Sequence, residues 1–171
     1  ALAMAIDREG LMQPFNIGGW IASTRIVPTI LSTPAQSPSE RWAALSLEQR
    51  RSDARQRVAQ WRAGSGQEPQ VSLFLPAGPG SDLLFEGLAG DFAASGVSAT
   101  RADTLDAADL TLRDRVARYA SPRWFRNQFN CTVSRPQCSE DADYLVALAL
   151  DARDGGEEAS YLYEAEAALL G

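Results

Sequence analysis

Residues 71–102 read VSLFLPAGPGSDLLFEGLAGDFAASGVSATRA, and this stretch decides the fold class. Val71–Leu75 is a short apolar run of strand length, followed by prolines and glycines that mark a turn. Ser81 is a residue type that caps helices. Apolar residues then recur at the spacing of one helix face, at Leu84, Leu88 and Phe92. Gly96 suits the position just beyond a helix end, and Val97–Ala102 predicts a second strand.

A strand, a helix and a second strand with short joints form a βαβ unit, so the two strands should be parallel and the crossover right-handed. Asp109–Arg113 alternates in polarity and predicts a third strand. The remaining apolar spacing predicts helices at residues 1–12, 46–62, 122–130, 139–151 and 157–170. Capping-box patterns stand at Ser37–Glu40 and Ser46–Gln49. We therefore predict an α/β fold with a small mixed sheet flanked by helices.

The helix predicted over residues 46–62 is rich in arginine. We expect it to lie on the surface with four residues facing inward: Leu47, Ala54, Val58 and Trp61. Four arginines follow one another closely on it: Arg50, Arg51, Arg55 and Arg57. Such a run can bind nucleic acid or can be a solvated helix face. The net charge of −6 favours the solvated face and excludes a nucleic-acid partner, because phosphate binding needs a basic surface.

Two residue types are missing, and their absence limits the chemistry. The length of 171 residues suits one domain. The sequence contains no His and no Lys, so all 16 basic residues are Arg. Catalytic arrangements that need His or Lys cannot be built within this chain. No pair of acidic residues indicates carboxylate catalysis, so we expect a non-catalytic protein without cofactor or metal. No apolar run reaches the length of about 18 residues that a membrane span needs.

The two cysteines, Cys131 and Cys138, lie in a segment with Asn130 and Pro136. A zinc site usually needs four nitrogen or sulfur ligands, and two thiols do not supply them. Buried free thiols and a disulfide remain as alternatives. We favour a disulfide that closes a short loop, which would indicate an oxidising compartment and contribute about 2–3 kcal/mol to stability.

Five segments carry a resemblance that covers nearly the whole chain: Ala1–Glu9, Gly18–Trp20 with Val27-Pro28, the βαβ unit with Gly96-Val97, Asp109–Pro122, and Cys138–Glu166. In this order they resemble the C-terminal lobe of the peptide/nickel-type extracytoplasmic solute-binding proteins of ABC importers. The connection at Asp103–Ala108 is shorter than in that family. The oligopeptide-binding members place an Asp in an A-D-Y motif to hold the peptide amino terminus, and Arg118 stands at that position here.

The resemblance implies a periplasmic-binding-protein type II fold, with residues 1–171 as the C-terminal lobe. The N-terminal lobe and the return to it would lie outside this sequence. It implies binding of a peptide-like or other small solute, with an ABC permease as the membrane partner. It also implies a periplasmic or extracytoplasmic location, including a membrane-anchored form of the full-length protein.

Five residues are candidates for the ligand site. Arg115 and Arg118 follow the third predicted strand, and a guanidinium there could meet a ligand carboxylate or phosphate; the alternative is a surface ion pair. Tyr119 and Trp124 stand beside them and could form an aromatic wall or belong to the core. Trp20 follows two glycines and could line the ligand cleft or anchor its loop.

A protein of another class would fit part of these observations. A stand-alone α/β domain could use its arginine-rich helix to dock a protein partner. The length of the complete open reading frame separates this alternative from a lobe of a binding protein.

Overall fold

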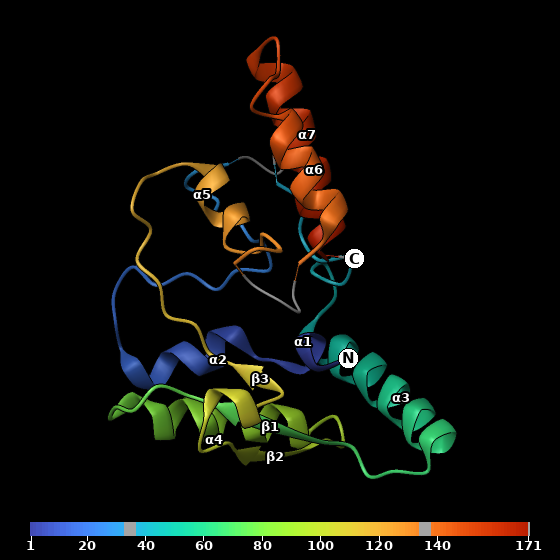
Figure 1. Cartoon of the computed structure of the whole chain (residues 1–171). Coiled ribbons are helices and arrows are strands. Elements are labelled where there is room, and N and C mark those ends of the chain that lie inside the picture. The colour runs from blue at the N-terminus through green and yellow to red at the C-terminus, as the bar shows by residue number, and fades with distance from the viewer. Residues whose placement is uncertain (33–36, 134–137, 171) are drawn as a thin grey trace. The chain divides into compact units, whose positions relative to one another are not determined.

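The computed structural model describes residues 1–32, 37–133 and 138–170 (Figure 1). The chain divides into two compact units. The first unit comprises Ala1–Ala22 and Ala44–Asp114, and the second comprises Ser23–Ala43 and Arg115–Gly171.

The first unit contains a three-stranded sheet in the order β2-β1-β3. The strands are β1 (Gln70–Phe74), β2 (Ser98–Arg101) and β3 (Leu110–Thr111), and η2 (Leu105–Ala107) connects β2 to β3. Val71 pairs with Ala99, and Leu73 pairs with Leu110. Helix α4 (Gly80–Ala93) joins β1 to β2, so the predicted α/β class and βαβ unit are confirmed. The sheet was predicted as mixed, but its described strands pair only in parallel.

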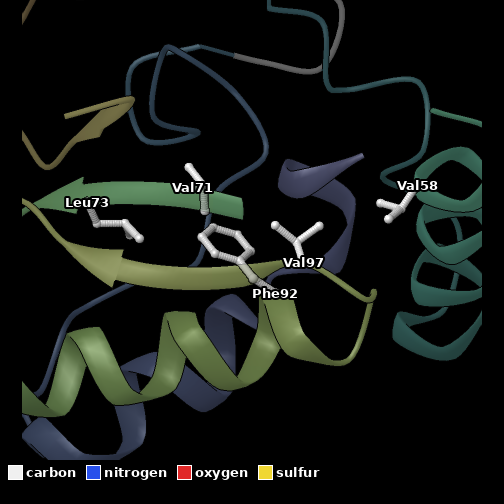
Figure 2. Packing of buried hydrophobic residues seen from close by; sticks show 5 residues of the cluster. All are labelled: Val58, Val71, Leu73, Phe92 and Val97. Atoms are coloured by element: carbon white, nitrogen blue, oxygen red, sulfur yellow. The ribbon is translucent and has the colours of Figure 1, made fainter. Parts of the chain in front are cut away.

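A small apolar core holds the sheet against α4 and α3 (Leu47–Ser65). Its buried members come from both helices, from β1 and from the residue just before β2: Val58, Val71, Leu73, Phe92 and Val97. Figure 2 shows the ring of Phe92 pointing from α4 toward the sheet residues. Phe92 is 1% exposed, and burial of such a side chain contributes about 2–3 kcal/mol. Gly96 has a φ of +84° and lets the chain turn directly from α4 into β2.

Helix α3 begins as predicted. The Ser46 hydroxyl accepts a hydrogen bond from the Gln49 amide at 3.2 Å, and the Gln49 side chain accepts one from the Ser46 amide at 2.9 Å. Ala54 and Val58 are buried as expected. Trp61 was predicted to face inward, and this is wrong: it is 49% exposed and lies near the end of α3, beside a hollow of the surface.

The arginines of α3 hold the first unit together, and they are not simply a solvated face. Arg51 Nε donates to the Ala5 carbonyl at 3.1 Å, and Arg50 Nη1 donates to the Ile6 carbonyl at 3.2 Å. Arg51 also pairs with the buried carboxylate of Asp91 on α4. These bonds use carbonyls that a continuous helix would occupy itself.

The helix predicted over residues 1–12 is therefore interrupted. The structure has α1 (Leu2–Ala5), α2 (Arg8–Met12) and η1 (Gln13–Phe15). Asp7 begins α2 by accepting a hydrogen bond from the Gly10 amide at 3.0 Å. The Asp7 amide in turn donates to Asp91 at 2.8 Å. The spacing of apolar residues along the sequence gives no information on such long-range hydrogen bonds, so it could not predict the interruption.

The second unit contains α5 (Pro122–Asn127), α6 (Glu140–Leu148) and α7 (Gly155–Leu170), and α6 packs against α7 (Figure 1). Ser37 was predicted to cap a helix, and this is wrong. No helix follows it before α3, and Ser37 is fully buried. Its hydroxyl donates instead to Glu166 Oε1 at 2.7 Å. Pairing with a buried carboxylate from a distant helix overrides the local capping pattern.

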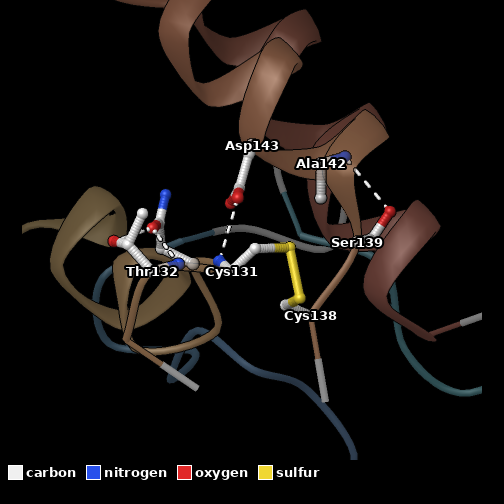
Figure 3. Close-up of a disulfide and its surroundings, with 7 residues drawn as sticks. Cys131, Thr132, Cys138, Ser139, Ala142 and Asp143 are labelled. Carbon is white, nitrogen blue, oxygen red and sulfur yellow. Dashed lines mark hydrogen bonds between the residues drawn. A yellow bond between two sulfur atoms is a disulfide. The ribbon is translucent and has the colours of Figure 1, made fainter. Parts of the chain in front are cut away.

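The predicted disulfide is present (Figure 3). Cys131 and Cys138 are bonded to each other with a Cα–Cα distance of 5.0 Å. The Cys131 amide donates to Asp143 on α6 at 2.9 Å, and Ser139 caps α6 through the Ala142 amide at 3.2 Å. Pro136 lies outside the described residues. No helix within the described ranges is long and apolar enough to cross a membrane.

Candidate functional site

A hollow of about 450 Å³ lies in the first unit at the edge where β1 and β3 end. We call it the carboxyl-edge pocket. Apolar side chains make up much of its lining: Leu11, Met12, Phe15, Trp20, Leu84 and Leu112. The turn at 76–81 supplies backbone, and Arg113 and Asp114 supply charge.

The topology explains why this edge is hollow. Parallel strands end on the same side of a sheet, and ligands in open α/β folds gather beyond those ends. Pro76–Gly80 leaves β1, and residues 112–114 leave β3. The turn that leaves β1 does not fill the space, because its proline and glycine side chains are small or absent. The loop after η1 brings Trp20 to the same place.

Two aromatic rings form one wall of the carboxyl-edge pocket. The centroids of Phe15 and Trp20 are 5.5 Å apart, with an interplanar angle of 43°. Gly80 allows this arrangement, since a Cβ atom at that position would lie 2.7 Å from Phe15 Cε1. Trp20 is 50% exposed. Trp20 lines this pocket, and its role in ligand binding stays a prediction.

The polar side chains at this pocket differ in whether they already have a hydrogen-bond partner. The Ser81 hydroxyl donates to the Pro76 carbonyl, so Ser81 is not the helix cap that we predicted; Pro79 holds that position. Arg113 and Asp114 are exposed. Across residues 1–32, 37–133 and 138–170, their side chains make no hydrogen bond or ion pair with one another or with other residues. They are therefore available to a ligand.

Arg115 and Trp124 are brought together within the second unit. Arg115 Nη1 donates to Gln128 Oε1 at 2.5 Å, and Gln128 Nε2 donates to the Trp124 carbonyl at 3.1 Å. Trp124 is half-buried and meets Phe125 edge to face, with ring centroids 5.0 Å apart. Both candidates are thus tied to α5, and Arg115 already has a neutral partner.

Arg118 and Tyr119 lie on the exposed segment before α5, and Tyr119 is 52% exposed. Among the residues with described positions, no hydrogen bond joins either side chain to Trp124 or to any other group. Trp20 belongs to the first unit, and the other four predicted site residues belong to the second. The role of each in ligand binding stays a prediction.

Sequence reasoning missed the pocket residues that follow β3. Leu112 and Arg113 were assigned to the third strand, which ends earlier, at Thr111. Ligands in α/β folds bind beyond the carboxyl ends of strands, so a shorter predicted third strand would have indicated these residues. A second hollow, of about 470 Å³, lies at the opposite edge where β1 and β2 begin, beside Trp61. The described part of the chain contains no cluster of three or more acidic, Cys or His side chains that could hold a metal.

Comparison with solved structures identifies the fold. OppA of Haemophilus influenzae, solved in complex with the peptide RPPGFSPFR, matches 99% of this chain with a TM-score of 0.84 and 16% identity, over 36% of its own length. The murein tripeptide binding protein MppA of Escherichia coli matches 99% of the chain with a TM-score of 0.82 and 19% identity, also over 36% of its length. A peptide-binding protein of a peptide ABC transporter matches 99% with a TM-score of 0.77 and 18% identity, over 84% of its length.

The chain therefore has the fold of one part of the OppA-like peptide-binding proteins, as the resemblance of the sequence implied. It spans about a third of the length of OppA and MppA. No family model matches the sequence, and no curated protein matches it.

Proposed function

We propose that this chain is a ligand-binding lobe of an extracytoplasmic solute-binding protein, which delivers a small solute to an ABC permease. The observation that most supports the proposal is the carboxyl-edge pocket. It lies where α/β folds bind ligands, in a fold shared with proteins that bind peptides. The disulfide suits an oxidising, extracytoplasmic location.

The lobe would act without catalysis, by providing one wall of a clamp. We propose that residues 1–171 form the C-terminal lobe and that a second lobe closes over the solute about a hinge. Tight binding then needs contacts from both walls, so this chain alone binds weakly. The solute is released to the permease when the lobes reopen.

The charge of the ligand is the feature that Arg118 would determine. The oligopeptide binders that the sequence resembles have an Asp at this position, which holds a cationic amino terminus. An exposed guanidinium would repel that group and favour a carboxylate or a carbonyl oxygen. The proposed solute is therefore peptide-like or otherwise rich in carbonyl groups, and its amino terminus is not held by a charge.

Calorimetry at high protein concentration tests this ligand preference. The chain is titrated with a tripeptide and with its N-acetylated form, and the two should bind with the same affinity. Arg118→Ala should weaken binding of the acetylated peptide by about 10-fold, the scale of a charge-assisted hydrogen bond. Arg153→Ala, in the exposed connection before α7, is the matched control and should have no effect. Loss of binding on acetylation would show that the amino terminus is read and would contradict the assignment of Arg118.

A further inference from the structure

We propose that the carboxyl-edge pocket is the subsite for one bulky apolar group of the ligand, an aromatic or branched aliphatic side chain. The inference rests on the proposed function and specifies which part of the solute this lobe selects. It places selectivity for this apolar group in the first unit, at Phe15, Trp20 and Leu84, in addition to the charge preference proposed for Arg118.

The size and lining of the pocket support an apolar occupant. Its volume of about 450 Å³ lies within the range of small-molecule pockets, about 300–1,000 Å³. The apolar side chains come from four separate segments: α2, η1 with the loop after it, α4, and the chain beyond β3. A charged group placed against these apolar walls, away from Arg113 and Asp114, would lose its hydration without gaining a partner.

The charges of Arg113 and Asp114 indicate what adjoins the apolar group. One positive and one negative side chain stand next to each other, both exposed. Together they carry no net charge, so they do not select an anion or a cation. They offer a donor and an acceptor to a backbone that presents both a carbonyl oxygen and an amide hydrogen. An apolar side chain on a peptide-like backbone can pack against the apolar walls, while the backbone forms hydrogen bonds with the two charged residues.

The surface beside the pocket is also apolar. Trp20 is 50% exposed, and Ile17 and Ile21 on the same loop are 50% and 75% exposed. Exposed apolar residues that gather on one loop commonly mark a binding site. An apolar ligand group that enters beside Trp20 would cover part of this surface, and its burial would contribute to affinity.

Three tripeptides test the inference: Ala-Phe-Ala, Ala-Ala-Ala and Ala-Asp-Ala, each titrated into the full chain by calorimetry. We expect Ala-Phe-Ala to bind at least about 10-fold more tightly than Ala-Ala-Ala, because a fully buried phenyl group contributes a factor of this size or more. Ala-Asp-Ala should bind no better than Ala-Ala-Ala.

A pair of glycine variants on α4 then locates the subsite. Gly80→Ala places a methyl group against Phe15, whose ring must move, and it should remove most of the preference for Ala-Phe-Ala. Gly90→Ala lies on the same helix, and apart from that helix's own backbone no described atom lies within 4 Å of the added Cβ, so it should preserve the preference. In Gly80→Ala the atom that must move belongs to the side chain of Phe15 and not to the backbone, so both variants should remain folded. Circular dichroism checks this.

The outcomes separate this inference from the proposed function. Equal affinity for the three peptides would overturn the apolar subsite but leave solute binding intact. A preference for Ala-Phe-Ala that Gly80→Ala and Gly90→Ala leave unchanged would place the selective site elsewhere and also overturn the inference. Absence of binding by any of the peptides at millimolar concentration would overturn both the inference and the proposed function.

Discussion

Glu166 connects three segments of the second unit through its buried carboxylate. It is fully buried on α7. Its Oε1 accepts hydrogen bonds from the Ile26 and Val27 amides at 3.0 and 3.2 Å, and its Oε2 accepts one from Arg126 at 2.8 Å. Burial lowers the pKa of Arg126, and the attraction of Glu166 partly offsets that effect. One carboxylate thus fixes α5 and the backbone at Ile26 and Val27 against α7.

Glu166→Gln should destabilise the protein by about 3 kcal/mol, because it keeps the size of the side chain but leaves a buried guanidinium without its counter-charge. Denaturant unfolding measures the loss, and hydrogen exchange of the Val27 amide should quicken. Glu164→Gln, two residues away and exposed, is the control and should change stability by less than about 0.5 kcal/mol. Equal effects of the two changes would show that the buried pair does not stabilise the unit.

Asp109 makes the stability of the first unit depend on pH. Its carboxylate accepts hydrogen bonds from the Ser72 amide and hydroxyl, both at 2.8 Å. These bonds hold the pKa of Asp109 below its usual value, with the amide as the larger cause. A carboxyl group with a lowered pKa in the folded state contributes stability above its unfolded pKa, about 3.9. The contribution is lost as the pH falls through the folded pKa.

Asp109→Asn should therefore lower the urea midpoint at pH 7, and the difference from the natural protein should shrink below about pH 4. The measurement is a series of urea unfolding curves across that range. Asp106→Asn provides a control, since the Asp106 carboxylate accepts no hydrogen bond from any residue with a described position. A difference for Asp109→Asn that stays constant from pH 7 to pH 3 would contradict the assignment to Ser72.

At the scale of elements, the disulfide positions the start of α6. Cys138 precedes the Ser139 cap, and the Cys131 backbone amide donates a hydrogen bond to the Asp143 carboxylate in the same helix (Figure 3). The disulfide closes a loop in which the cysteines are seven residues apart in sequence. Replacing both cysteines by serine should lower stability by about 2–3 kcal/mol, through the regained freedom of the unfolded chain.

Thiol titration of the unfolded, unreduced protein isolated from its native compartment checks the bond itself. We expect no free thiol, since both cysteines are paired in the structure. Two free thiols per chain would show that the bond does not form in that compartment. The extracytoplasmic location would then lose its support.

Local patterns predicted elements well where the relevant contacts are local. The Ser46–Gln49 capping box and the turn at Gly96 involve residues a few positions apart, and both are present. The break between α1 and α2 depends on Arg50, Arg51 and Asp91, which are distant in sequence, so apolar spacing could not show it. Ser37 failed as a cap for the same reason, because its partner is on α7.

The candidate site was predicted only in part, and the reason is again distance along the chain. Trp20 was predicted to line a cleft because a tryptophan in a loop after two glycines is costly to expose, and this role stays a prediction. Phe15 and Leu84 looked like ordinary apolar residues of helices, and only the folded chain brings them to one hollow. The third strand was predicted too long, which hid Leu112 and Arg113 among strand residues.

At the scale of the whole molecule, the first unit offers two hollows at opposite edges of one sheet. They have similar volumes, about 450 Å³ at the carboxyl edge and about 470 Å³ at the amino edge. Volume therefore does not decide which of them binds a solute. We assign the ligand to the carboxyl edge because strand ends, the aromatic wall and the exposed charges of Arg113 and Asp114 coincide there.

Nuclear magnetic resonance of the ¹⁵N-labelled chain during titration with Ala-Phe-Ala tests this assignment most directly. We predict that the largest amide shifts occur at the carboxyl edge, at Ala77, Gly78 and Arg113, and at the Trp20 indole. The amide chemical shifts of Gln70 and Val97 at the amino edge should not change. The largest shifts at the amino edge, or no shift at saturating peptide, would contradict the assignment.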